Sequence, residues 1–281
     1  MMTTERTRTP LSVIEPPHGW HLPNLRELWE HRELLFYLTL RDLRVRYQHT
    51  VLGIGWVILH PMVSMIIYTV LFGGLARLPS DNLPYAVFAF AGLVPWGFFS
   101  NSVIGASNSL SKNAGLAAKV YFPRLVLVFA AIFPVWADAV ITFIALQVLM
   151  LAFGIFPGIG VIALPAFVLL AIITALGVGI WLAALSVQYR DVSQIPNLLM
   201  TVWLYASPVI YSPSLIPAGW ASTLYWLNPM AHVLQGFRWA LLGAGFPPIV
   251  PLLISTAGAL VLLTSGLIYF ERVERTFVDL I

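Results

Sequence analysis

Residues 125–153 read LVLVFAAIFPVWADAVITFIALQVLMLAF, a run in which Asp138 is the single charged side chain. A helix needs about 20 mostly apolar residues to cross the hydrocarbon core of a bilayer. This run therefore predicts a membrane-spanning helix, interrupted at Pro134, which has no N–H to donate. A soluble core does not require an apolar stretch of this length, so we interpret the chain as integral to a membrane.

Further apolar segments flank this run and predict a helical protein that crosses the membrane six times. The predicted spans cover about residues 53–75, 85–104, 125–153, 161–187, 195–211 and 249–270. The external segment 212–248 mixes prolines with Trp and Tyr side chains. Prolines prevent a complete helical crossing, and these aromatics suit the headgroup layer, so we expect short re-entrant or interfacial helices there.

The composition restricts the chemistry. Of 281 residues, 59% are hydrophobic and 10% are charged, whereas a soluble domain is about a quarter charged. The absence of cysteine excludes disulfides, thiolate metal sites and a cysteine nucleophile. The six histidines include no pair at metal-ligand spacing on a helix, so we expect no metal site in this chain.

The cationic residues are distributed unequally. All Lys and Arg residues except Arg77 and Arg238 fall on one side of the predicted spans. Cationic loops are retained in the cytoplasm, so this pattern predicts the inner (cytoplasmic) membrane with both termini cytoplasmic. Insertion topology and anionic headgroups also account for the net charge of +3, and we expect no nucleic-acid partner. Residues 1–23 and 272–281 are predicted cytoplasmic tails, the first of them disordered.

Residues 24–48 predict an amphipathic helix that precedes the six-span region, residues 49–271. Apolar side chains recur at helical spacing on one face: Trp29, Phe36, Leu40, Leu43 and Tyr47. The other face is too charged to cross a bilayer, so we expect the helix to lie along the cytoplasmic membrane surface. The alternative is a soluble helix packed on another domain.

Transport against a gradient would need an energy source. A phosphate-binding loop needs glycines followed by a Lys that reaches the terminal phosphates. The two lysines, Lys112 and Lys119, follow Ser111 and Ala118, so the chain has no such motif. If ATP and magnesium drive this protein, a partner subunit binds them.

The polar residues singled out inside the predicted spans are His60, Asn101 and Asp138. A carboxylate is costly in a membrane, so Asp138 should face the bundle interior with a polar partner such as Asn101 or Gln147. Its isolation favours a structural or pore-facing role over direct ion coupling, which stays open. His60 is interpreted as a packing and hydrogen-bonding residue.

Aromatic residues are numerous and dispersed. Most are expected to anchor spans or to pack, but flat aromatic faces also stack on sugar rings in a wide conduit. The candidates for a conduit lining are Tyr68, Phe88, Trp96, Phe98, Phe99 and Trp136.

Several short motifs follow one another along the chain. They are RDLRVRY (41–47), TVLG (50–53), AGLVPW (91–96), KVYFPR (119–124), YRDV (189–192), SPVIY (207–211) and NPM (228–230). In this order they resemble the permease subunits of ABC-type polysaccharide exporters. The likeness extends from about residue 25 to residue 271.

This resemblance implies a homodimeric permease that works with two copies of a separate ATP-binding subunit. It also implies a coupling helix over about residues 107–122, with candidate contacts Ser109, Ser111, Lys112, Asn113, Leu116, Lys119 and Tyr121. Similar proteins carry O-antigen, teichoic acid or capsular glycans on undecaprenyl pyrophosphate. Cations suited to that pyrophosphate are Arg41, Arg44, Arg46, Lys119 and Arg124. The alternative is that these cations only set membrane topology.

We therefore expect ATP-driven export of a lipid-linked polysaccharide, with O-antigen as the first candidate. One alternative is a drug or lipid efflux permease of the same superfamily. Another, from a different class, is a membrane-embedded transferase that acts without ATP or a partner.

Overall fold

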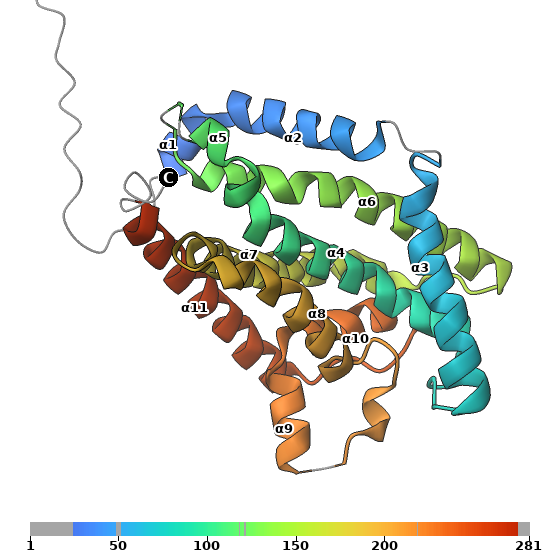
Figure 1. Cartoon of the computed structure of the whole chain (residues 1–281). Helices are drawn as coiled ribbons and strands as arrows, with labels where there is room; N and C mark the ends of the chain where they lie inside the picture. Colours follow the sequence, from blue (N-terminus) through green and yellow to red (C-terminus); the bar gives the residue numbers. More distant parts are fainter. Residues whose placement is uncertain (1–24, 49–51, 118, 121, 218, 275–281) are drawn as a thin grey trace, which may run out of the picture.

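The computed structural model describes residues 25–48, 52–117, 119–120, 122–217 and 219–274. Within these ranges the regular structure is helical without β-strands, which confirms the all-α class (Figure 1). Five helices in the described part of the chain are long and apolar enough to cross a membrane. They are α3 (Gly55–Tyr68) with its π-helical continuation Thr69–Leu75, α4 (Tyr85–Lys112), α6 (Leu125–Ala152), α7 (Leu164–Gln188) with the preceding 3-10 turn Ile159–Ala163, and α11 (Ile249–Glu274).

The long helix α4 forms the centre of the bundle and packs against α6, α7 and α10 (Pro229–Leu242). Its 28 residues extend about 42 Å at 1.5 Å per residue, more than the hydrocarbon core of a bilayer. Residues 107–112, the first part of the predicted coupling segment, form the last turns of α4. In the described part of this segment, α5 (Ala114–Ala117) follows as a separate short helix.

Small residues allow α4 and α7 to approach closely. A Cβ atom at Gly179 on α7 would lie 2.6 Å from the Cβ atom of Ala106 on α4. A larger side chain at this position would force the two helices apart. In the most apolar 18-residue stretch of α4, 78% of the residues are buried inside the protein. In the corresponding stretch of α3 and its π-helical continuation, 6% are buried. The core therefore forms around α4, and α3 lies at its edge.

The predicted surface helix consists of α1 (Leu25–Glu30) and α2 (Arg32–Tyr47), with a turn at His31. Figure 1 shows α2 beside α6, with which it makes extensive contact. Leu38 is buried there among Leu125 and Val126. Two members of the predicted apolar face, Trp29 and Phe36, are exposed on the protein surface. Leucines therefore attach α2 to the bundle, and these two aromatics face outward.

The fifth predicted span corresponds to α8 (Ile195–Ala206), a helix of 12 residues and about 18 Å. It ends because Ser207 is extended, the conformation favoured before a proline such as Pro208. In the predicted re-entrant region, α9 (Trp220–Leu227) is followed by α10, whose first turn is capped by the Asn228 side chain. Unlike an interfacial helix, α10 is largely buried in the bundle.

A fully buried arginine, Arg238, holds α10 against α4 and the segment that follows α8. The Arg238 guanidinium donates hydrogen bonds to the carbonyls of Val209 (2.8 Å) and Phe88 (3.4 Å). Its central carbon also lies 3.6 Å from the centroid of the Phe88 ring. Sequence reasoning treated Arg238 as one of two cations in external loops, whereas the structure uses it to join α4, α10 and the segment after α8.

We predict that Arg238→Met lowers the thermal stability of the detergent-solubilised protein. The substitution leaves the buried Val209 carbonyl without its donor, which costs about 1–3 kcal/mol. Thermal unfolding followed by tryptophan fluorescence measures the effect. The exposed Arg77 provides the control, and equal melting temperatures for Arg77→Met and Arg238→Met would contradict the assignment.

Candidate functional site

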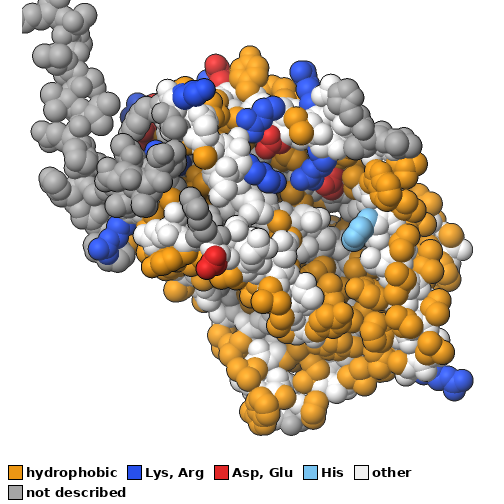
Figure 2. Space-filling model, viewed as in Figure 1, with side chains coloured by type: hydrophobic (Ala, Val, Ile, Leu, Met, Phe, Trp, Pro, Cys, Tyr) orange, Lys and Arg blue, Asp and Glu red, His pale blue; other side chains and the backbone are white. Residues whose placement is uncertain are grey.

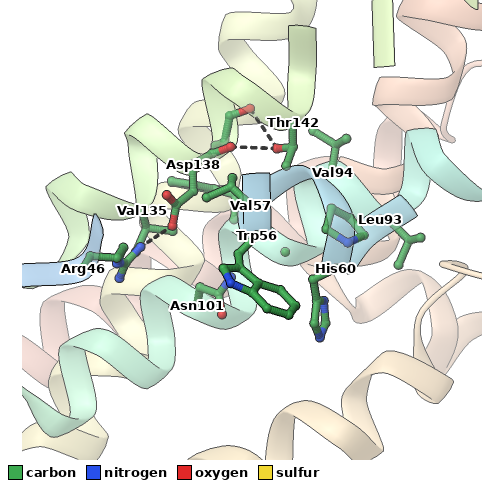
Figure 3. Close-up of a pocket in the computed structure, with 14 residues that line it drawn as sticks. Arg46, Trp56, Val57, His60, Leu93, Val94, Asn101, Val135, Asp138 and Thr142 are labelled. Carbon is green, nitrogen blue, oxygen red and sulfur yellow. Dashed lines mark hydrogen bonds and ion pairs between the residues drawn. The ribbon is translucent and has the colours of Figure 1, made fainter. Parts of the chain in front are cut away.

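A cavity of about 390 Å³ opens between α2, α3, α4 and α6. Figure 3 shows its polar residues around one space: Arg46 from α2, Trp56 and His60 from α3, Asn101 from α4, and Asp138 and Thr142 from α6. Trp56 and His60 are four positions apart, so one face of α3 presents both. The cavity brings several hydrogen-bonding groups together within a helical bundle that is otherwise mostly apolar. It is therefore the candidate functional site.

The Asp138 carboxylate is bound by two side chains from the end of α2. Arg46 donates to one carboxylate oxygen, and the Tyr47 hydroxyl donates to the other. Sequence reasoning proposed Asn101 or Gln147 as the partner, and the structure shows Arg46 and Tyr47 in that role. The Arg46–Asp138 ion pair joins two segments that are distant in sequence. It compensates a carboxylate that is mostly shielded from solvent.

The environment of Tyr47 keeps its hydroxyl protonated. Partial burial, the hydrogen bond to Asp138 and the nearby carboxylate charge raise the pKa of Tyr47 to about 12. At neutral pH the phenol therefore acts as a donor to Asp138. The end of α2 is consequently held against α6 by one charged and one neutral donor.

Arg41, which precedes Arg46 by five residues on α2, contacts the predicted coupling segment. Arg41 donates to the Asn113 side-chain oxygen at 2.7 Å, and Asn113 donates to the Ser109 carbonyl at 2.8 Å. Arg41 also pairs with its neighbour Asp42. The helix α2 therefore bridges the turn after α4 and the polar cavity.

The remaining predicted coupling residues differ in accessibility. Ser111, Lys112 and Lys119 are exposed, Leu116 is half-buried, and Ser109 is buried, with its hydroxyl donating to the Ala106 carbonyl. Tyr121 lies outside the described residues. An external partner would therefore contact the turn through Ser111, Lys112 and Lys119 rather than through Ser109.

The five predicted headgroup cations do not gather at one place. Arg46 lines the cavity and Arg41 contacts Asn113, while Arg44 and Lys119 are exposed. At the start of α6, the backbone N–H of Arg124 donates to the Glu274 carboxylate at 2.8 Å. Arg46 is thus the predicted headgroup residue that lies in the cavity.

The predicted conduit aromatics are mostly packed within the bundle. Phe88 and Phe99 are fully buried, and Trp96 and Phe98 nearly so. Tyr68 and Trp136 are half-buried. In this conformation Phe88 lies beneath Arg238 and Phe99 packs edge-on against Trp203, with ring centroids 5.1 Å apart. Those two rings offer no surface to a conduit here.

Sequence reasoning did not include Tyr47 and Trp56 among the site residues. Their signal was present: Tyr47 ends the RDLRVRY motif, and Trp56 precedes His60 by one helical turn. The missing information was tertiary, because spacing along α2 and α3 does not reveal that Tyr47 contacts Asp138 on α6 or that Trp56 lines the same cavity as Asp138.

Comparisons with known proteins identify the family to which the chain is similar. Residues 33–242 match the family model described as ABC-2 type transporter. The chain is 33% identical to the "O-antigen export system permease protein RfbA" of Myxococcus xanthus, covering 91% of this chain and 98% of that protein. A Klebsiella pneumoniae protein of the same name is 28% identical, covering 73% and 79%. The "Polysialic acid transport protein KpsM" of Escherichia coli is 23% identical, covering 73% and 80%.

We predict a measurable energetic coupling between Arg46 and Asp138. A double-mutant cycle with Arg46→Gln and Asp138→Asn should give about 1 kcal/mol of interaction in unfolding experiments, because the two side chains contact directly. Arg44→Gln, an exposed position on the same helix, is the matched control and should not couple to Asp138→Asn. Additive effects of the Arg46 and Asp138 substitutions would contradict the pairing.

Proposed function

We propose, because the chain belongs to the ABC-2 type transporter family, that it is the membrane subunit of an exporter for lipid-linked polysaccharide. O-antigen is the first candidate for the cargo. The observation that carries this proposal is the likeness to the Myxococcus xanthus O-antigen export permease, which extends along nearly the whole of both chains. The likeness to KpsM supports a capsular glycan as the second candidate.

The energy source in this proposal is a separate ATP-binding subunit, which binds both ATP and magnesium. The family membership supports such a partner. The chain itself contains no loop that combines glycines with a phosphate-binding Lys. We infer that the partner docks on the charged end of the molecule, where α1, α2 and α5 lie. Figure 2 shows Lys, Arg, Asp and Glu side chains gathered at that end, above a largely hydrophobic surface.

The contacts of α2 suggest how the partner's motion reaches the membrane. The exposed residues Ser111, Lys112 and Lys119 receive the partner at the turn after α4. The Arg41–Asn113 hydrogen bond transmits displacement of this turn to α2. At the C-terminal end of α2, Arg46 and Tyr47 carry the displacement to Asp138 and the polar cavity.

The functional unit in this proposal contains two copies of the chain. In one copy, the rest of the protein buries very little of the helix α3. The helix α8 is too short to cross the membrane alone. A second copy beside these helices would enclose a conduit, with α8 and the segment after it completing a sixth crossing. The charged end, with both termini, would face the cytoplasm according to the distribution of Lys and Arg. The glycan would arrive on undecaprenyl pyrophosphate.

Two other functions make different predictions. A drug or lipid efflux permease would move apolar or cationic compounds and would not respond to glycan length. A membrane-embedded transferase would turn over without a partner, and the match to a transport family argues against this class.

We predict that proteoliposomes containing both this chain and its ATP-binding partner accumulate lipid-linked glycan in an ATP-dependent way. Protease-resistant, lectin-detectable glycan measures the transport. Liposomes with the permease alone are the control and should show none. Full-rate transport without the partner, or efflux of dyes with no glycan transport, would contradict the proposal.

We also predict that Asn113→Leu separates ATP hydrolysis from transport. The substitution removes the acceptor for Arg41, so glycan export should fall several-fold while ATP hydrolysis by the complex continues. Asn113→Asp retains an oxygen for Arg41 and should preserve export. Equal export by the two variants would exclude the Arg41 contact from the coupling route.

A further inference from the structure

The polar cavity adjoins a second, apolar cavity. The second cavity has a volume of about 480 Å³ and lies between α4, α6, α7 and α10. Val94, Phe98 and Ala139 line both cavities and form their common wall. One polar and one apolar compartment therefore meet at the contact between α4 and α6.

The polar compartment contains several hydrogen-bond donors. Both oxygens of the Asp138 carboxylate already accept hydrogen bonds from Arg46 and Tyr47. Arg46, Trp56 and Asn101 line the same space, and each side chain carries N–H groups that can donate further hydrogen bonds. Such a donor set suits the oxygens of a phosphate, since a guanidinium beside a phosphate forms a charge-assisted hydrogen bond.

The apolar compartment suits a single hydrocarbon chain. Each described side chain in its lining is apolar, including Phe98, Trp136, Phe143 and Phe237. It extends to Val161 and Leu164, at the start of α7, whereas Arg46 lies at the end of the molecule where charged groups gather. A lipid with its phosphate near Arg46 would therefore point its hydrocarbon chain away from the charged end. Lipids in the membrane leaflet nearest the charged end have the same orientation.

We propose that the two cavities form one binding site for a polyprenyl phosphate lipid. Its phosphate occupies the polar cavity, and the adjoining part of its single hydrocarbon chain occupies the apolar cavity. A two-chain phospholipid fits less well, because one apolar compartment adjoins the polar one. This inference rests on the proposed function, in which such a lipid carries the glycan, and it assigns the α4–α6 contact as the place where the carrier binds.

The test uses the complete transporter, with its ATP-binding partner, in phosphatidylglycerol nanodiscs. The probe is undecaprenyl phosphate with a photoactivatable diazirine in its chain, and mass spectrometry locates the labelled peptides. Val140→Trp fills the apolar cavity from a half-exposed position on α6. The matched control is Val148→Trp, which is similarly exposed on the same helix and lines neither cavity.

We expect labelling of α4, α6 and α7 that unlabelled undecaprenyl phosphate displaces and added phosphatidylglycerol does not. Val140→Trp should reduce labelling about tenfold, the scale of a misfit in an apolar pocket, while Val148→Trp leaves it unchanged. Asn101→Leu, which removes a donor without breaking a described side-chain hydrogen bond, should reduce it several-fold. A monodisperse elution profile establishes that each variant is folded.

Three results would overturn the site: equal displacement by phosphatidylglycerol, equal loss in Val140→Trp and Val148→Trp, or labels confined to other helices. Glycan export by the same wild-type preparation is measured in parallel. Absent labelling with intact export would refute the lipid site alone. Specific labelling without glycan export would refute the proposed polysaccharide function and support the lipid site.

Discussion

One carboxylate, that of Asp138, fixes the end of α2 against the membrane bundle. Asp138 lies within the third apolar run, where an unpaired charge would be strongly unfavourable. Arg46 and Tyr47 satisfy its two oxygens, and in doing so they hold the end of a charged helix against α6. The same interaction thus lowers the free-energy cost of burying the carboxylate and fixes the position of the end of α2. The polar cavity forms at this point because α3 begins a few residues after Tyr47 and closes the space from the side.

The sequence was sufficient to predict the elements that depend on long apolar runs. Five of the predicted crossings correspond to helices of suitable length. The predicted interruption at Pro134 is wrong, because α6 continues through this residue. The fifth predicted span is different, because hydropathy alone does not register that Pro208 forces Ser207 out of the helix. The burial of α10 was also missed, since its flanking prolines and aromatic neighbours are equally typical of an interfacial segment.

The candidate site was predictable only in part, for a physical reason. Asp138, His60 and Asn101 could be selected because polar groups in apolar runs are costly and must find partners. Which partners they find depends on the packing of α2 along α6, which the spacing of residues along α2 does not reveal. Leu38, outside the predicted apolar stripe, is buried in the bundle, while Phe36, within it, is exposed. Spacing along a helix therefore identified the candidates, and tertiary contacts determined their roles.

The two ends of the bundle differ in how firmly their parts are joined. At the end near α9, Arg238 links α4, α10 and the segment after α8 through buried hydrogen bonds in a dry environment, where each lost bond is costly. At the charged end, α2 is joined to its neighbours through half-exposed polar contacts, and α3 has little buried surface. Displacement of the turn at Asn113 would therefore move α2 and α3 more readily than it would rearrange α4, α7 and α10. Such a displacement would alter the shape of the polar cavity first, because α2 and α3 form two of its walls.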